Sequence, residues 1–421
     1  MNIKTVFRAL RHKNYRLFFS GQSISLIGTW MQQIAVSWLV YRMTNSAFLL
    51  GLVGFSSQIA TFLLAPLAGV IADRHHRHRL LLITQSLAML QAVVLYILYI
   101  THSIAVWHII LLSFFLGAVN AFDIPVRQSF TVDMINDRED LSNAIALNSS
   151  MVNAARLIGP SIGGILIALF GEGTCFLVNA LSYIAVLFSL GMMELPHWER
   201  SSRQKESVIL QLKEGFLYTL NFMPIRTILM LLSVMSLVAG GVQALMPVFA
   251  RDIFHGGART LGILMAASGL GALAGAIYLA NRRNVLGLSK IIACSAALFG
   301  IGVISFSRTS VLIIGLPILL FSGFGMMVQM ASSNIILQTI VEEDKRGRVM
   351  SFYTKAFKGL APFGSLLSGF LATRIGADST LLWGGGFCII AVIIFALQLP
   401  KFRKLVRPVY VQKGIIAEPV E

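Results

Sequence analysis

Apolar residues fill long runs along almost the whole chain, and each run is about as long as a helix that crosses a membrane. A bilayer has a hydrocarbon core about 30 Å thick, so a spanning helix needs roughly 20 predominantly apolar residues. Six such runs precede the polar stretch 196–224 and six follow it. The pattern therefore predicts an all-α membrane protein with twelve transmembrane helices. The runs cover residues 17–40, 46–72, 80–100, 104–122, 141–170, 174–193, 227–250, 260–280, 291–307, 309–341, 349–373 and 379–400.

The second group of runs repeats the first. A shift of 205 residues places segment 135–143 on segment 340–348, so a polar turn precedes a glycine-rich helix in each half. The same shift aligns Gly171 with Gly376. Two repeats that start on the same side of the membrane predict a pseudo-two-fold axis along the membrane normal, as in transporters whose substrate site lies between the repeats. We expect a six-helix bundle at 1–195, a cytoplasmic linker with an interfacial helix at 196–224, a second six-helix bundle at 225–400 and a cytoplasmic tail at 401–421.

The charge balance orients these helices. The chain has 34 Lys and Arg against 18 Asp and Glu, a formal net charge of +16. Basic residues of membrane proteins collect in cytoplasmic loops, and the loops on one side of the predicted spans carry most of them, starting with the basic segment 4–16. Both termini should therefore face the cytoplasm. This account explains the positive charge without a nucleic-acid partner, and it makes the lipid bilayer the surrounding medium.

Composition excludes other classes of protein. Hydrophobic residues make up 56% of the chain and charged residues 12%, whereas soluble domains have about 25% charged residues. Neither a nucleotide-binding G-x-x-x-x-G-K-[ST] loop nor a paired cysteine motif occurs, so we predict no enzyme activity, no ATP hydrolysis and no cofactor. The histidines of segment 75–78 could form a metal site, but a solvated basic turn is the favoured interpretation, so we predict no metal.

The loop after the second run carries a motif. Its residues Gly69-Val-Ile-Ala-Asp-Arg-His-His-Arg-His-Arg79 resemble the G-x-L-A-D-R-x-G-R-[RK]-R signature of the major facilitator superfamily, with His76 where that superfamily usually has Gly. The resemblance implies the major facilitator fold. It also implies a latch, in which Asp73 accepts hydrogen bonds from the start of the eleventh span and Arg77 pairs with Asp123. The candidate latch residues are Gly69, Asp73, Arg74, Arg77, Arg79, Asp123 and Arg127.

Further segments extend the resemblance. The fifth run contains Gly159, Pro160, Gly163 and Gly164, which resemble the antiporter motif of drug-efflux branches, although close helix packing explains small residues equally well. Segments 7–19, 28–33, 120–127 and 143–149 look like the branch that contains the enterobactin exporter. This resemblance implies a monomer in the bacterial inner membrane that exports siderophores or other bulky metabolites.

Polar stripes mark the first, fourth, seventh and tenth runs, which line the cavity in this superfamily. Interhelical hydrogen bonds are the alternative explanation for such residues. Charged residues within spans are more selective, because burying one at the bilayer centre costs at least about 2.5 kcal/mol. Arg156, Lys355 and Lys358 could bind an anionic or catechol-like substrate, unless the two lysines extend to the membrane surface. The candidate substrate-binding residues are Gln22, Thr29, Gln33, Asn120, Asn153, Arg156, Gln243, Gln329, Tyr353, Lys355 and Lys358.

The acidic residues bear on energy coupling. They all fall in predicted loops or at span ends, with Asp123 nearest to the membrane, so we expect no buried carboxylate. Proton antiport would then need Asp123, Asp73 or His108. The favoured hypothesis is a secondary active exporter of a bulky small molecule that works by alternating access, with protons as one candidate coupling ion. A broad drug or metabolite efflux pump and an importer with the same fold remain alternatives.

Overall fold

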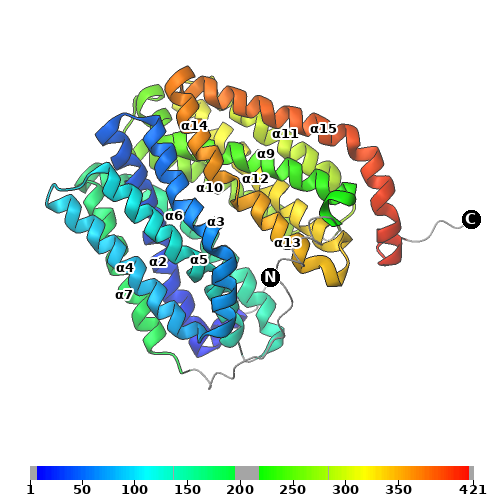
Figure 1. Ribbon diagram of the computed structural model, residues 1–421, viewed down its shortest axis with the longest axis horizontal. Helices are drawn as coiled ribbons and strands as arrows, with labels where there is room; N and C mark the ends of the chain where they lie inside the picture. The colour runs from blue at the N-terminus through cyan, green and yellow to red at the C-terminus, as the bar shows by residue number, and fades with distance from the viewer. Residues whose placement is uncertain (1–6, 136, 195–217, 283, 417–421) are drawn as a thin grey trace, which may run out of the picture. The chain divides into compact units, whose positions relative to one another are not determined.

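Every regular element is a helix in the computed structural model, which describes residues 7–135, 137–194, 218–282 and 284–416 (Figure 1). The first part of the chain contains η1 (Arg8–Arg11), α2 (Lys13–Thr44), α3 (Ala47–Arg74), α4 (Arg77–Ile100), α5 (Val106–Asp133), α6 (Arg138–Phe170) and α7 (Glu172–Gly191). The second part contains α9 (Met223–Val248), η2 (Phe249–Ile253), α10 (Ala258–Ala280), α11 (Leu288–Ser307), α12 (Leu312–Ile340), α13 (Glu343–Lys358), α14 (Ala361–Ile375) and α15 (Ala377–Gln412).

Ten helices of the described ranges are long and apolar enough to cross a membrane, so the chain is a multi-pass membrane protein. The predicted first and eleventh spans are not among the ten. α2 has 32 residues, but glutamines and terminal basic residues dilute its apolar character. The eleventh span is interrupted, because α13 ends at Lys358 and α14 begins at Ala361.

The helix bounds follow the internal repeat. α6 covers residues 138–170, and α13 and α14 together cover 343–375, which is the same range shifted by 205 residues. α7 and α15 each begin directly after a glycine with positive φ, Gly171 at 82° and Gly376 at 86°. Residues with a Cβ atom rarely adopt this conformation. The two glycines therefore make the same tight connection in both repeats.

Two compact units can be distinguished, one of residues 1–203 with 244–269 and one of residues 204–243 with 270–421. In the first unit α2 packs against α6 and α7, α3 against α5, and α4 against α5 and α7. In the second unit α11 packs against α12 and α15, and Gly240 of α9 lies against Ala361 of α14. Helices at equivalent positions in the two repeats thus pack against equivalent neighbours. For example, α2 packs against α6, and α9 packs against α14.

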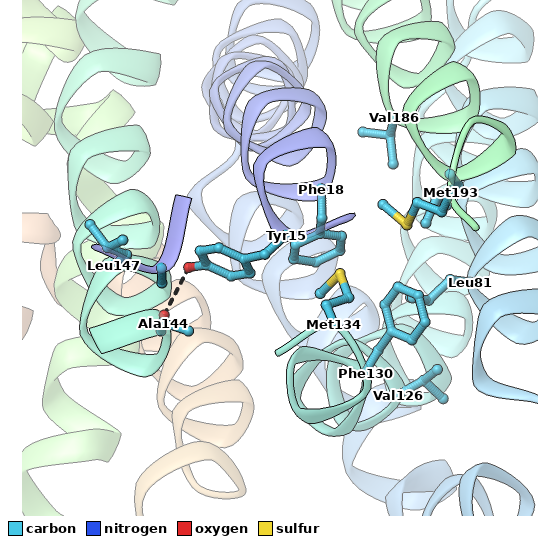
Figure 2. Packing of buried hydrophobic residues seen from close by; sticks show 12 residues of the cluster. Tyr15, Phe18, Leu81, Val126, Phe130, Met134, Ala144, Leu147, Val186 and Met193 are labelled. Atoms are coloured by element: carbon cyan, nitrogen blue, oxygen red, sulfur yellow. Dashed lines mark hydrogen bonds between the residues drawn. The ribbon is translucent and has the colours of Figure 1, made fainter. Parts of the chain in front are cut away.

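A buried cluster joins five helices near the start of the chain (Figure 2). Tyr15 and Phe18 of α2 lie among side chains of α4, α5, α6 and the end of α7. The rings of Phe18 and Phe130 meet edge to face with centroids 6.1 Å apart, a favoured aromatic geometry. The Tyr15 hydroxyl donates to the carbonyl of Ala144 at 2.9 Å. The cluster therefore fixes α2 against the ends of α5 and α6.

One predicted boundary changes. The fourth span was expected to end at Phe122, but α5 continues to Asp133, which places Asp123 inside the helix. The polar residues of this last part stay helical because α4 and the cluster of Figure 2 pack against it. The interfacial helix predicted at 196–224 lies largely outside the described residues.

Candidate transport site

Accessibility varies along the polar stripe of α2. Gln22 is 2% exposed, Thr29 is half-buried and Gln33 is exposed. The Thr29 hydroxyl donates to the carbonyl of Ser25 at 2.9 Å and lies 3.4 Å from the Tyr183 hydroxyl of α7. Of these three predicted residues, Gln33 presents the most polar surface, whereas Gln22 is enclosed among helices.

Arg156 of α6 forms the most distinctive accessible group in the first unit. Its side chain is exposed, and its guanidinium carbon lies 5.6 Å from the centre of the Trp30 ring on α2, within the range of a cation–π contact. On the same helix the Asn153 amide is half-buried and donates to the carbonyl of Ser149 at 2.9 Å. A cation held on an aromatic face can contact an anionic or aromatic ligand, because the guanidinium keeps free donor directions.

Close packing of α6 and α2 positions this pair. A Cβ atom on Gly159 would lie 2.5 Å from the Trp30 Cβ atom, and one on Gly163 would lie 2.7 Å from a methyl carbon of Ile34. Gly164 faces another neighbour, since its Cβ would lie 2.7 Å from the carbonyl of Ala258 at the start of α10. Pro160 is buried between them. The residues of the antiporter-like motif thus serve as close helix contacts in this structure.

The predicted substrate-binding residues of the second unit are also partly buried and partly accessible. Gln329 is fully buried and donates to the Ser333 hydroxyl at 3.2 Å, and Tyr353 donates to the carbonyl of Met330 at 3.0 Å. Lys355 is half-buried with its ammonium 5.3 Å from the centre of the Phe352 ring. The remaining residues with accessible surface are Lys358 and Gln243, both exposed, and, in the first unit, half-buried Asn120.

Asp123 is a buried carboxylate, 4% exposed. Its Oδ1 atom accepts hydrogen bonds from Thr84 at 3.0 Å and Gln85 at 2.7 Å, while its Oδ2 atom lies 3.6 Å from Nε of Arg127. The expectation of no buried carboxylate was therefore wrong. The chain shields Asp123 because α5 extends past the apolar run and α4 covers it.

The predicted partner of Arg77 was also wrong. Arg77 donates to Asp133 at 2.8 Å, almost three helical turns beyond Asp123 on α5. Asp133 is available because α5 runs to that residue. The side chains of Gly69, Asp73 and Arg74 at the end of α3 lie outside the description, so the latch proposed for Asp73 stays a prediction; Arg79 is exposed.

Two of the three histidines after α3 contact backbone carbonyls. His78 contacts the carbonyl of Leu190 at 2.9 Å through Nε2, and His75 contacts the carbonyl of Ile71 at 3.1 Å through Nδ1. Within the described residues no group of three or more His, Cys, Asp or Glu side chains could hold a metal ion.

An amide network inside the first unit was not predicted from the sequence. Gln32 of α2 donates to Gln91 of α4 at 2.8 Å and accepts from Asn179 of α7 at 2.8 Å. All three side chains are buried. Single amides within apolar runs were the available signal, but their pairing depends on tertiary neighbours. Fully paired buried polar groups fix the relative positions of the helices that carry them.

Two charged clusters were missed as well. At the start of α6, Asp140 is fully buried against Arg8, Arg11 and His12, with Arg11 Nε at 2.7 Å from Oδ2. At the other end of α2, the Tyr41 hydroxyl donates to Asp252 of η2, and Arg251 donates to Asn45 at 2.6 Å.

A further ion pair lies at the start of α2. Glu194, which follows α7, pairs with Lys13 at 2.7 Å, and the hydrogen bond and charge of Lys13 lower the pKa of Glu194. Contacts of this kind fasten the ends of α2 within its unit.

Comparison with known proteins identifies the family. The family described as transmembrane secretion effector matches residues 4–412. The staphyloferrin A transporter of Staphylococcus aureus is 28% identical over 393 residues, which cover 92% of this chain and 97% of that protein. The enterobactin exporter of Escherichia coli O6:K15:H31 is 26% identical, covering 93% of this chain and 94% of that protein. Macrolide efflux protein A of Streptococcus pyogenes is 22% identical, covering 94% and 99%.

Solved structures agree on the fold. A bacterial homologue of the human lysosomal transporter Spinster, in an inward-facing and occupied conformation, superposes with a TM-score of 0.71 at 14% identity, covering 94% of this chain and 98% of that one. A mutant of the nucleoside transporter NupG gives 0.70 at 13% identity, covering 91% and 99%. Likeness at such identity concerns the fold alone. The chain belongs to the transmembrane secretion effector family, a family of transporters within the major facilitator superfamily.

Proposed function

We propose that this protein is a secondary active exporter in the bacterial inner membrane that carries a siderophore or another bulky, anionic small molecule. It works as a monomer with twelve spans, both termini in the cytoplasm, and two six-helix bundles at 1–195 and 225–400 that alternate access to a central site. The names of two relatives, a staphyloferrin A transporter and an enterobactin exporter, support a siderophore as substrate.

The observation that carries the proposal is the accessible Arg156 on the face of Trp30. A permanently charged side chain within a predicted membrane span costs at least about 2.5 kcal/mol at the bilayer centre and needs a partner. In the described part of the first unit no acidic side chain pairs with Arg156. An anionic substrate supplies the missing charge, and Trp30 supplies a flat surface for a ring.

In the second repeat Lys355 and Lys358 supply the matching positive charge. Both lie in the last turn of α13, with Lys355 half-buried and Lys358 exposed. Positive charge in each repeat suits a polyanionic substrate. Hydrogen bonds to this substrate come from the accessible amides of Gln33, Asn120, Asn153 and Gln243. The surrounding helices are held by Gln22, Gln329 and Tyr353.

Proton antiport couples export to the membrane gradient through Asp123. Neutral donors saturate its Oδ1 atom, whereas Oδ2 has only the longer contact with Arg127. A proton arriving at Oδ2 neutralises the carboxylate and releases Arg127 from the ion pair. The Tyr183 hydroxyl of α7 is also close enough to interact with the charge of Asp123. Asp73 latches the bundles by accepting hydrogen bonds from the start of the eleventh span, as in the superfamily, so Asp73→Asn should cut transport and leave expression intact.

Flux of three probes tests the proposal. Enterobactin, staphyloferrin A and erythromycin are offered to inverted and right-side-out membrane vesicles that contain the protein. Export predicts that a siderophore probe accumulates in inverted vesicles whose lumen is more acidic than the medium. Accumulation in right-side-out vesicles would instead identify an importer. Transport of erythromycin alone would favour a drug efflux pump, a function that the likeness to macrolide efflux protein A supports.

Arg156→Ala makes this test specific to the site. A hydrogen bond to a charged group contributes about 1.5–3 kcal/mol, so the variant should raise the KM for a siderophore probe by about tenfold or more. Arg308→Ala, which removes an exposed cation after α11, is the matched control and should transport normally. Equal KM values in both variants would remove Arg156 from the substrate site.

Analysis of the culture medium identifies the exported compound in the source organism. Mass spectrometry of medium from iron-starved wild-type and deletion strains should show loss of a siderophore in the deletion strain, with accumulation inside the cells. Iron-independent differences would point to a broader metabolite exporter.

A further inference from the structure

The last helix is too long to lie within a membrane along its whole length. α15 has 36 residues, which correspond to about 54 Å at 1.5 Å per residue, whereas the hydrocarbon core is about 30 Å thick. The 23 residues from Ala377 to Leu399 already suffice to cross it. Pro400 follows, and Figure 1 shows that the red end of α15 turns away from its orange part. A proline inside a helix is an established cause of such a bend. Residues 401–412 therefore form a helical extension outside the span.

One face of this extension is fixed to the protein. Phe402, Val406 and Tyr410 recur at four-residue steps and are 2%, 2% and 9% exposed. The ammonium of Lys413, directly after α15, lies 3.5 Å from the carbonyl of Val341 at the end of α12, and the Phe402 ring lies 6.0 Å from that of Phe395, an earlier residue of α15 itself. These contacts hold the extension at a defined place on the second unit.

The opposite face is basic. Lys401, Arg403, Lys404 and Arg407 are all exposed. At about 100° per residue, Lys401, Lys404 and Arg407 lie on the side away from Phe402, Val406 and Tyr410, and Arg403 lies at the border of the buried face. No acidic residue occurs between Lys401 and Ile416. None of the four cations forms an ion pair in the part of the chain whose side chains the structure describes. Leu405, 40% exposed, lies at the edge of the basic face.

We propose that this face of α15, which we call the basic platform (Lys401, Arg403, Lys404 and Arg407), binds the phosphate headgroups of anionic membrane lipids. Clusters of four or more basic residues directly after a transmembrane helix attract anionic lipid surfaces. The apolar edge at Leu405 suits the boundary between headgroups and acyl chains. Basic loops that only orient a membrane protein need no fixed arrangement, whereas here a buried face holds four cations in one place.

Occupancy of the basic platform by lipid should stabilise the second unit, because ligands that bind only the folded state shift the unfolding equilibrium. The inference is independent of the substrate and of the direction of transport, since it requires only that the protein spans a membrane.

Thermal unfolding of the purified full-length protein tests the proposal. The protein is placed in detergent micelles that contain phosphatidylglycerol or, as the neutral reference, phosphatidylcholine, and bound lipids are counted by native mass spectrometry. The test variant is K401Q/R403Q/K404Q/R407Q. The control variant, R16Q/R259Q/K290Q/R308Q, removes the same charge from exposed positions elsewhere. Because all eight side chains are exposed, both variants should fold, which size-exclusion chromatography verifies.

Phosphatidylglycerol should raise the unfolding midpoint of the wild type and of the control variant above that in phosphatidylcholine. The test variant should lose this increase and bind phosphatidylglycerol at least about tenfold more weakly, since each cation adds to the attraction. High salt should reproduce the loss in the wild type.

Three outcomes would overturn the proposal. The first is an equal response of test and control variants. The second is full stabilisation by inorganic phosphate at matched ionic strength, which would make free phosphate the ligand. The third is tighter binding of a short DNA duplex than of phosphatidylglycerol to the same four residues, which would make the basic platform a nucleic-acid surface.

Discussion

α6 and the pair α13 and α14 occupy the same place in the two repeats, yet only α6 is continuous. Each contains a proline, and its position explains the difference. Pro160 lies inside α6, where the lost hydrogen bond costs roughly 3 kcal/mol, and glycine contacts with α2 hold the helix together. Pro362 lies in the first turn of α14, where no donor is needed. A proline near a helix start thus marks a break, whereas a proline between packed glycines does not.

The difference changes the surroundings of the basic residues. Arg156 lies in the middle of an unbroken helix, where it makes its cation–π contact with Trp30. Lys355 and Lys358 lie in the last turn of α13, where positive charge complements the partial negative charge of the helix end. The helix end stabilises the charge of the two lysines, whereas Arg156 has no such helix end beside it. Arg156 is therefore the better candidate for substrate recognition.

The largest expected effect comes from adding a Cβ atom where another helix packs closely against α6 or α14. A Cβ atom on Gly364 would lie 1.8 Å from the backbone carbonyl of Leu237, and one on Gly159 would lie 2.5 Å from the Trp30 side chain. Gly364→Ala should destabilise the protein more than Gly159→Ala, because backbone yields less than a side chain, and each should cost at least about 1–3 kcal/mol. Unfolding midpoints in detergent measure the effect.

Gly191→Ala and Gly386→Ala are the controls for this prediction, since nothing lies within 4 Å of a Cβ atom at either position. If all four variants unfold at the same temperature, the close contacts do not hold these helices.

A second asymmetry between the repeats concerns charge at mid-helix. Asp123 of α5 corresponds to Val328 of α12, and both side chains are buried. Asp123→Asn should remove the dependence of flux on a pH gradient while keeping downhill exchange, a loss of about 5- to 150-fold in gradient-driven accumulation. Reconstituted vesicles with and without the gradient provide the measurement. Asp133→Asn, which alters the ion pair with Arg77 nearby, should keep the dependence. Gradient-driven flux in the Asp123 variant would assign coupling to another group.

The starts of the two helices differ in charge as well. Asp140 is fully buried against Arg8, Arg11 and His12, whereas the equivalent Lys345 makes a partly exposed pair with Glu342. Replacing the buried Asp140 removes a charge that pairs with three basic groups, two of them 39% and 56% exposed, whereas a single exposed pair contributes little. Asp140→Asn should therefore lower the unfolding midpoint clearly, and Lys345→Gln should leave it almost unchanged. A reversed order would contradict this account of how the N-terminal segment is held.

The smallest expected effect concerns the break itself. The Ser236 hydroxyl of α9 donates to the carbonyl of Phe357, which the end of α13 leaves without a helical partner. Ser236→Ala should cost about 1 kcal/mol. Ser295→Ala, a buried serine that bonds only within its own helix, should cost less. Comparison of the two midpoints isolates the contribution of the contact across the break.

Hydrophobic periodicity and the internal shift were sufficient to predict the helical membrane fold, because both are properties of the sequence itself. The shift also aligned Gly171 with Gly376, and the structure shows that both glycines form tight turns. Partners across helices were harder to predict. Arg77 was assigned to Asp123 because α5 was expected to end at its last apolar residue, and the true partner Asp133 lies beyond it. The pairing of Gln32 with Gln91 and Asn179 depends on helix rotation, which no local pattern encodes.

The one-residue turns at Gly171 and Gly376 have a mechanical consequence. Each joins two helices through a single glycine with positive φ, so no flexible loop separates the two helices. A movement of α6 must carry α7 with it, and a movement of α14 must carry α15. Each helix pair therefore moves as one rigid unit. An epitope or probe inserted at either glycine turn would affect both helices of its pair at once.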